Sequence, residues 1–177
     1  MKTAIKQTKL WQEAGFPSIR VAVNISVLQF QDPHFVKTVV QALEETHLEP
    51  TYLDLEITES VMQNMKESIV LLQKLKEIGV YLSIDDFGTG YSSLSLLKDL
   101  PIDNLKIDQS FVHDLMNHVH ALDIVKTIID MGRNLKLEVI AEGIENERQL
   151  SMLKKIKCTY GQGYYFSQPL TVEEVEH

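Results

Sequence analysis

The sequence predicts an α/β protein of the (β/α)8 TIM-barrel type that is incomplete here, with about six of the eight strands. Two observations predict this class: short apolar runs alternate with amphipathic stretches, and a polar residue stands at the end of nearly every run. Buried strands that alternate with helices form parallel sheets with right-handed crossovers. A complete barrel needs about 250 residues, so the 177 residues of this chain leave room for fewer strands.

Six runs rich in β-branched and apolar residues are expected to be the strands. They are Arg20–Asn24, Tyr52–Glu56, Val80–Asp85, Asn104–Asp108, Leu137–Glu142 and Tyr160–Phe166. Between them, apolar residues recur at three- or four-residue spacing, which is typical of helices that bury one face. This periodicity is clear over residues 65–78 and 122–129, and a further helix over residues 2–15 precedes the first strand.

Local signals agree with these helix boundaries. Asp32, Ser60 and Asn146 occupy capping positions that predict helix starts, the last two with a glutamine three residues later. Gly79 and Gly132 are expected to follow helix ends, because glycine favours the left-handed backbone found there. The chain is therefore expected to run as one helix followed by a series of strand-helix units.

Polar residues at the carboxyl ends of the strands favour a barrel over a doubly wound sheet. They are Asn24, Glu56, Asp85, Asp86, Lys106, Asp108, Glu142 and, near the last strand, Gln162. In a barrel this rim is the active-site face and many strands contribute to it, whereas a doubly wound sheet binds its ligand mainly at one switch point. We therefore expect the functional side chains to gather at this rim.

Composition limits the classes of partner. Hydrophobic residues make up 44% of the chain, which is enough for a sizeable core, and we expect a single domain over residues 1–177. The net charge is −8, and an acidic surface repels duplex nucleic acid and anionic lipid. No apolar run approaches the ~18 residues of a membrane span, and the single cysteine, Cys158, cannot form an internal disulfide. A cytoplasmic setting fits best.

The acidic rim residues predict a divalent-metal site. Glu56, Asp85, Asp86 and Glu142, with the amide of Asn24, form an all-oxygen donor set suited to Mg²⁺ or Mn²⁺ rather than zinc. One carboxylate of an adjacent aspartate pair can bridge two metals ~3.5 to 4 Å apart, an arrangement that serves phosphoryl displacement. An Asp-Asp pair alone is more often a cap or a turn, and the shared rim position of the other residues favours the metal site.

Three further features leave alternatives open. Lys106 could hold a water molecule or a phosphate oxygen, or it could pair with Asp108 on the same strand face. The glycines of residues 88–90 could admit a phosphate group or simply form a turn. The aromatic residues 164–166 could stack on a base or belong to the core.

Six ordered motifs resemble the EAL-domain family of bacterial cyclic-di-GMP phosphodiesterases. They are Ala-Val-Asn-Ile-Ser (22–26), Leu-Glu-Ile-Thr-Glu-Ser (55–60), Asp-Asp-Phe-Gly-Thr-Gly-Tyr-Ser-Ser-Leu (85–94), Leu-Lys-Ile-Asp (105–108), Ala-Glu-Gly-Ile-Glu (141–145) and Gln-Gly-Tyr-Tyr-Phe (162–166). The match extends from about residue 4 to residue 171. The family's fold is a (β/α)8 barrel, so the resemblance implies the same architecture as the residue patterns.

The resemblance also implies a role for each matching residue. Asn24, Glu56 and Asp85 look like ligands of a first metal, and Asp85, Asp86 and Glu142 like those of a second. Lys106, Glu142 and Asp86 are the implied catalytic residues, with Lys106 holding the hydrolytic water and Glu142 as the candidate general base. Glu59 resembles a glutamate that braces the metal-binding loop and the dimer contact, and Gln162 a polar residue near the substrate.

The implied reaction is hydrolysis of one phosphodiester bond of cyclic di-GMP, which opens it to linear pGpG. The implied partners are cyclic di-GMP, a second copy in a homo-oligomer, and an N-terminal sensor or GGDEF domain in the parent protein. One departure is large: the sequence Glu-Ala-Leu, which names the family and supplies a metal ligand, does not occur here. We expect a fragment that lacks the first two strands. The alternative is a non-catalytic EAL module that binds cyclic di-GMP or a protein.

Overall fold

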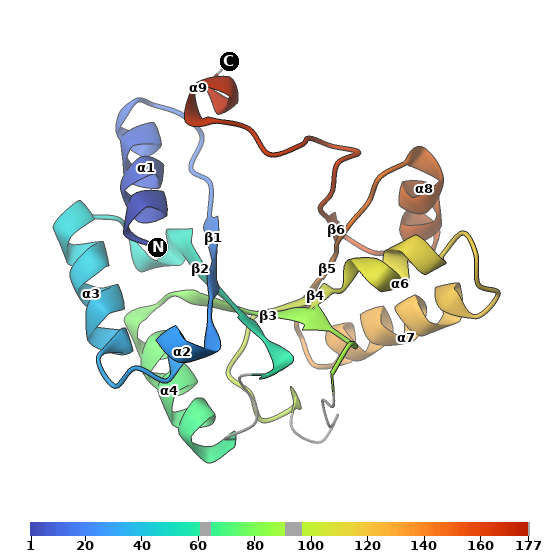
Figure 1. The fold of residues 1–177 in the computed structure, drawn as a ribbon, viewed down its shortest axis with the longest axis horizontal. Helices are drawn as coiled ribbons and strands as arrows, with labels where there is room; N and C mark the ends of the chain where they lie inside the picture. Colours follow the sequence, from blue (N-terminus) through green and yellow to red (C-terminus); the bar gives the residue numbers. More distant parts are fainter. Residues whose placement is uncertain (61–64, 91–96, 177) are drawn as a thin grey trace. The chain divides into compact units, whose positions relative to one another are not determined.

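The computed structural model describes residues 1–60, 65–90 and 97–176 and has an α/β architecture (Figure 1). Its six strands are β1 (Val21–Ile25), β2 (Leu53–Thr58), β3 (Tyr81–Phe87), β4 (Asn104–Ile107), β5 (Glu138–Ala141) and β6 (Tyr160–Gly161). They form one sheet in the order β1-β2-β3-β4-β5-β6, with parallel pairing of β1 to β2, β2 to β3 and β5 to β6. A doubly wound sheet reverses its strand order at a switch point. The sequential order instead confirms an incomplete barrel.

The helices of the described residues precede the first strand, alternate with the strands and follow the last one. They are α1 (Lys2–Glu13), α2 (Val27–Phe30), α3 (Phe35–Thr46), α4 (Met65–Ile78), α6 (Gln109–Asp114), α7 (Ala121–Asn134), α8 (Glu147–Lys155) and α9 (Val172–Val175), with a 3-10 turn at Pro50–Tyr52. The chain divides into two compact units. Unit 1 holds residues 1–85 and 90–104, and unit 2 holds residues 86–89 and 105–177. The single domain over residues 1–177 stays a prediction.

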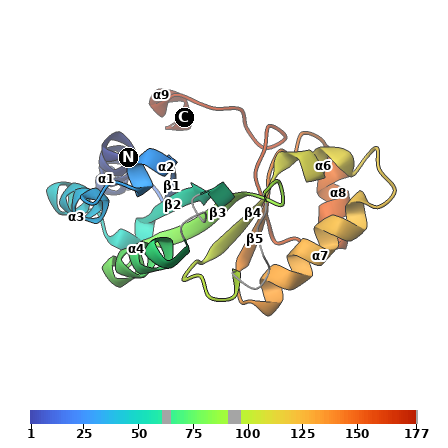
Figure 2. The same cartoon turned by 60° about the horizontal axis from the view of Figure 1, so that its bottom comes forward.

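Unit 1 packs helices against the first three strands. In Figure 2, α3 and α4 run side by side along these strands, and α1 contacts both α3 and β1. The burial follows the strand period, because Leu53, Leu55 and Ile57 on one face of β2 are at most 1% exposed. The opposite face of β2 carries Asp54 and Glu56. Hydrophobic packing on one face therefore fixes which polar side chains point to the other.

Unit 2 repeats this arrangement with α6, α7 and α8 beside β4 and β5. Its core is formed by apolar residues at most 2% exposed, namely Leu105, Ile107, Val112, Val125, Ile129, Ala141, Ile144 and Leu153. The predicted cap at Asn146 is confirmed, since Asn146 and Gln149 form a reciprocal capping box at the start of α8. This cap fixes the point at which the chain turns back after β5.

Two predicted helix boundaries are wrong. Gly132 lies inside α7, which continues to Asn134. A Cβ at this position would approach Val139 Cγ2 to 2.3 Å. Glycine is therefore required here by close packing and not by a helix end. The helix predicted to start at Asp32 begins at Phe35. The Asp32 carboxylate accepts a hydrogen bond from the His34 amide, which lies just before the first helical residue.

The remaining boundary predictions have mixed outcomes. Gly79 follows α4 with a φ of 99°, as predicted. The cap at Ser60 requires residue 63, which lies outside the described residues. The last strand is shorter than predicted, since β6 ends at Gly161. Beyond it the chain turns at Gly163, where a Cβ would come within 2.3 Å of the Ile144 backbone, so regular pairing stops.

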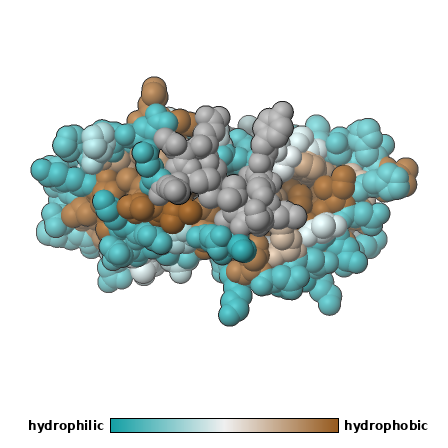
Figure 3. All heavy atoms as spheres, turned by 90° about the horizontal axis from the view of Figure 1, so that it is seen from below, coloured by the Kyte–Doolittle hydropathy of each residue, from teal (hydrophilic) through white to brown (hydrophobic). Residues whose placement is uncertain are grey.

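Hydrophobic residues reach the surface in several places. Figure 3 shows one face, on which brown hydrophobic residues lie among teal hydrophilic ones. The aromatic residues after β6 are part of the exposed set, with Tyr164 62% and Phe166 55% exposed. These two side chains are therefore not core in this structure. Among the described residues, no helix combines the length and the hydropathy that a bilayer span requires.

Candidate active site

Two predicted site residues meet on the first strand pair of unit 1. Asn24 on β1 and Glu56 on β2 are register partners, so their side chains leave the same face of the sheet. Asp85 on β3 is the register partner of Thr58, two positions further along β2, and therefore shares this face. Glu56 and Asp85 are 6% and 8% exposed. Unit 1 thus presents one amide and two buried carboxylates near the ends of its strands.

The backbone of Asp86 departs from the regular conformation of β3. Asp86 has a φ of 54°, in the left-handed region, although β3 continues through it to Phe87. Successive side chains of a regular strand point to opposite faces, and this change of backbone conformation interrupts the alternation. Carboxylate oxygens of Asp86 and Glu142, both in unit 2, lie within 4.8 Å of each other.

This carboxylate group has the chemistry of a divalent-cation site. Two oxygens on opposite sides of a Mg²⁺ ion are about 4.2 Å apart, because each bond is about 2.1 Å long. Carboxylate oxygens suit hard cations such as Mg²⁺ and Mn²⁺. Two of the predicted donors, Asp86 and Glu142, therefore fit such an ion in unit 2.

Lys106 and Glu142 form the best-defined contact among the predicted site residues. Lys106 Nζ lies 2.7 Å from Glu142 Oε1, and the two side chains are 4% and 16% exposed. Leu105 and Ile107 on the other face of β4 are fully buried, so the strand holds Lys106 in place. A buried cation next to a carboxylate can hold a water molecule or an anionic oxygen, and the carboxylate can take a proton.

Asp108 and the glycines of residues 88–90 have local structural roles. The Asp108 carboxylate caps α6 and accepts hydrogen bonds from the amide and hydroxyl of Ser110. Residues 88–90 begin with a turn, in which the Thr89 amide and hydroxyl both donate to the Asp86 carbonyl. Gly88 has a φ of 100° and packs against Phe111, which supports the turn interpretation.

Glu59 and Gln162 occupy supporting positions beside these elements. In unit 1, Glu59 lies just after β2, and a Cβ on Gly90 would approach its carboxylate to 2.1 Å. The loop after β3 is therefore in close contact with Glu59. In unit 2, the Gln162 amide donates to the Ala141 carbonyl, and the Gln162 carbonyl accepts from the Ile144 amide. The exposed Gln162 side chain follows the end of β6.

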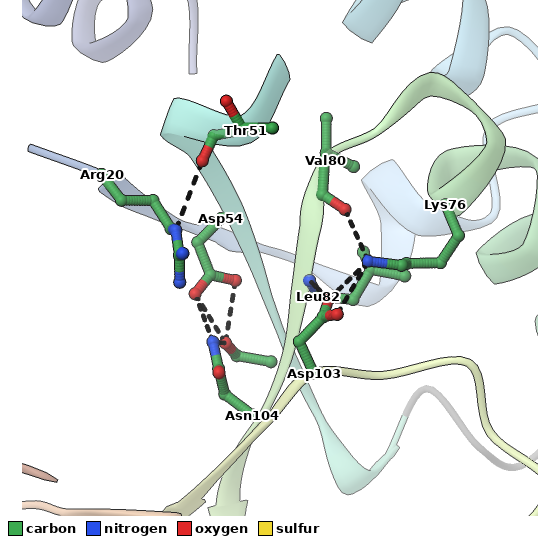
Figure 4. A network of polar contacts seen from close by, with 9 residues as sticks. Arg20, Thr51, Asp54, Lys76, Val80, Leu82, Asp103 and Asn104 are labelled. Atoms are coloured by element: carbon green, nitrogen blue, oxygen red, sulfur yellow. Dashed lines mark hydrogen bonds and ion pairs between the residues drawn. The ribbon is translucent and has the colours of Figure 1, made fainter. Parts of the chain in front are cut away.

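A second polar layer, which the rim prediction missed, lies two residues before the rim on three strands (Figure 4). Asp54 accepts hydrogen bonds from Ser83 Oγ and Asn104 Nδ2, all at 2.8 Å. Burial raises the pKa of the Asp54 carboxyl above its usual value, and the Ser83 hydrogen bond and the Arg20 charge oppose this shift. The sequence contained a signal for this layer. A polar residue stands two positions, one strand period, before the rim residue on each of the three strands. The pairs are Asp54 with Glu56, Ser83 with Asp85 and Asn104 with Lys106.

Cations surround this layer at the amino ends of the strands (Figure 4). The guanidinium carbon of Arg20 lies 3.2 Å from the centroid of the Tyr81 ring, and Nε donates to the Thr51 carbonyl. Lys76 Nζ is 2.8 Å from both carboxylate oxygens of Asp103. In barrels, polar contacts at the amino ends of the strands generally support stability, whereas the carboxyl ends carry the chemistry. We assign these contacts to stability.

A cavity of about 450 Å³ in unit 1 lies away from the predicted ligands. It is lined by residues of α2 and α4 and by the segment before α3, namely Val27, Phe30, Gln31, Asp32, Pro33, Glu67, Ser68 and Leu71. None of these is a predicted site residue. The carboxylate set and the Lys106 ion pair carry chemistry that this cavity lacks, so the rim remains the candidate site.

The chain is similar in sequence to known proteins of one family. The family model described as EAL domain matches residues 1–169. The chain is 44% identical over 174 residues to the signaling protein YkoW of Bacillus subtilis, covering 98% of this chain and 22% of YkoW. It is 42% identical to the bifunctional diguanylate cyclase/cyclic di-GMP phosphodiesterase MucR of Pseudomonas aeruginosa, covering 97% of this chain and 25% of MucR.

A solved structure, described as the PaMucR phosphodiesterase in complex with c-di-GMP, shares the fold. Its TM-score is 0.94 at 41% identity, and the match covers 98% of this chain and 71% of that one. The chain thus spans about a quarter or less of the curated relatives and most of a solved domain. Because the family model matches nearly the whole chain, this protein belongs to the EAL domain family.

Proposed function

We propose that this chain is part of a phosphodiesterase domain that hydrolyses cyclic di-GMP to linear pGpG in bacterial second-messenger signalling. The observation that carries the proposal is the ion pair of Lys106 and Glu142, 2.7 Å apart and largely buried, next to the Asp86 carboxylate. The similarity to MucR, a bifunctional diguanylate cyclase/cyclic di-GMP phosphodiesterase whose phosphodiesterase structure is a complex with c-di-GMP, supports this substrate.

The proposed cofactor is Mg²⁺ or Mn²⁺ in a two-metal site. Asn24, Glu56 and Asp85 would hold the first ion, and Asp85, Asp86 and Glu142 the second. The shared sheet face of Asn24, Glu56 and Asp85 in unit 1 and the close approach of Asp86 and Glu142 in unit 2 support this division. Bound divalent cations would neutralise charge on the phosphate and make a nearby water molecule more acidic.

The side chains supply the remaining chemistry of the proposed reaction. Lys106 would hold the water molecule by a hydrogen bond from Nζ, and Glu142 would accept the proton as this water attacks the phosphorus in line. One P–O bond forms as the bond to the opposite ribose oxygen breaks. That oxygen leaves with the bonding electron pair and takes a proton from solvent to become a hydroxyl group, which opens the ring. The ion pair between Lys106 and Glu142 keeps the lysine ammonium and the carboxylate close together, so both groups can contact one water molecule.

Two supporting roles complete the proposed site. Glu59 would brace the loop after β3, and its tight approach to Gly90 in unit 1 supports this role. Gln162 would contact the substrate from the end of β6, where its exposed side chain supports the assignment. The dimer contact through Glu59 belongs to the same proposal.

We further propose that the chain acts within a larger signalling protein. Its relatives are much longer, and one is described as bifunctional, with a diguanylate cyclase as well as a phosphodiesterase. We correspondingly expect a sensor or GGDEF domain before the EAL domain, a homo-oligomeric state and a cytoplasmic location. The single cysteine, Cys158, supports a reducing compartment.

The test is turnover of cyclic di-GMP by a longer version of the chain that includes the Glu-Ala-Leu strand. With Mg²⁺ or Mn²⁺, chromatography should detect pGpG as the product, whereas the 177-residue chain alone should give little. Glu142→Gln should remove most of the rate, because the amide cannot take the proton. Glu138→Gln, at the start of β5, the strand that Glu142 follows, is the matched control. Binding of cyclic di-GMP without any turnover would favour the non-catalytic module.

A further inference from the structure

The chain leaves β5 in an unusual backbone conformation directly after Glu142. The Glu142 amide donates to the Ile107 carbonyl at 3.2 Å, which ties the end of β5 to the end of β4. The next residue, Gly143, has a φ of 69°, in the left-handed region that glycine adopts without strain. The direction in which the Glu142 side chain leaves the backbone is therefore set by its immediate neighbour.

Gly143 also lies too close to α6 for any other residue. A Cβ on Gly143 would come within 2.5 Å of Gln109 Cβ and 3.2 Å of Gln109 Cα. These atoms are fixed to the backbone at the first turn of α6, and Asp108 caps that turn. No side-chain rotation of Gln109 can relieve the contact, so a Cβ would have to displace the backbone on one side.

The other side of the segment is held as well. The Ile144 amide donates to the Gln162 carbonyl at 3.1 Å, and the Ile144 carbonyl accepts from the Tyr165 amide at 2.9 Å. Gly163 approaches the Ile144 nitrogen closely, since a Cβ there would be 2.3 Å away. Because the neighbouring loop blocks movement in that direction, displacement at Gly143 would be transmitted to Glu142.

We propose that Gly143 is a positioning residue for Glu142: its contact with Gln109 sets the Glu142 carboxylate against Lys106. The inference deepens the proposed function, because it names the feature that places the general base. Its structural content is independent of turnover, since the ion pair of Lys106 and Glu142 is a property of the 177-residue chain.

The perturbation is Gly143→Ala, and its readout is the chemical reactivity of Lys106. Lys106 is 4% exposed and paired with Glu142, so reductive methylation should label it far more slowly than the exposed Lys136. In Gly143→Ala the displaced carboxylate should release the lysine, and the labelling rate of Lys106 should rise at least about 10-fold, because a hydrogen bond between charged groups is lost. Lys76, paired with Asp103 in unit 1, reports on general loosening, and its labelling rate should change less than about 2-fold because distant sites are nearly independent.

Two further variants separate positioning from backbone strain. Gly15 has a φ of 84°, and no atom lies within 4 Å of the point that a Cβ would occupy. Gly15→Ala therefore introduces similar strain without a steric contact and should leave Lys106 protected. Gly143→Ala combined with Gln109→Gly removes the opposing Cβ and should restore most of the protection. Peptide mass spectrometry measures all of these rates on the intact chain.

The outcomes are distinct. Selective labelling of Lys106 in Gly143→Ala, reversed in the double variant, supports the positioning role. Unchanged Lys106 labelling, or an equal rise at Lys76, overturns it, as does rapid labelling of Lys106 in the unmodified chain. If Lys106 behaves as expected but the longer chain has no turnover, the positioning inference stands and the proposed function fails.

Discussion

Replacing Gly132 by alanine tests the packing of α7 on β5, the strand that leads to Glu142. A new Cβ would lie 2.3 Å from Val139 Cγ2, whereas carbon atoms normally approach to about 3.5 Å. Overpacking of this kind costs about 1–3 kcal/mol, and the higher helix propensity of alanine returns about 1 kcal/mol. We therefore expect Gly132→Ala to lower the free energy of unfolding by about 1 kcal/mol.

A double-variant cycle makes this test specific to the contact. Val139→Ala alone should cost about 1.6 kcal/mol, from the two methyl-sized groups it removes. In that background the clash is gone, so Gly132→Ala should now stabilise the protein by about 1 kcal/mol. Urea unfolding followed by circular dichroism measures all four proteins. If Gly132→Ala stabilises the chain even when Val139 is present, the contact between α7 and β5 is not as described.

Three further predictions concern stability and assembly. Asn146→Ala should destabilise α8 by about 1 kcal/mol in urea unfolding, and Asn146→Ser should cost little, since serine also caps; equal losses would contradict the capping box. The raised pKa of Asp54 means that the folded state binds this proton more tightly, so its contribution to stability should be lost as pH rises from 3.8 through the raised value. Asp54→Asn should flatten that part of the pH profile, and an unchanged profile would refute the assignment. The outer edges of β1 and β6 should promote self-association, and a strictly monomeric mass in light scattering at all concentrations would count against it.

Much of the fold could be predicted because it depends on local periodicity. All six strands begin within one residue of their predicted starts, since apolar side chains on one strand face must be buried whatever the tertiary details. The rim residues followed from the same period, as did the shared face of Asn24, Glu56 and Asp85. Sequential order of the strands required only that each helix return the chain to the neighbouring strand.

Close approaches between distant segments could not be predicted in the same way. Gly132 looked like a helix end, because its actual neighbour, Val139, belongs to a different element. The left-handed backbone of Asp86 has no sequence signal, since aspartate adopts that conformation only occasionally. The stacking of Arg20 on Tyr81 depends on strand register, which single residue patterns do not specify across three strands.

Calorimetric titration of the 177-residue chain with Mn²⁺ tests the central claim, the metal site at the rim, most directly. We expect binding that is weaker than in a complete EAL domain, because the glutamate of the Glu-Ala-Leu motif is absent from this sequence. Asp85→Ala should reduce the affinity at least about 10-fold, whereas Asp130→Ala, an exposed carboxylate on α7, should not change it. The absence of binding at millimolar Mn²⁺, or an affinity unaffected by Asp85→Ala, would contradict the account.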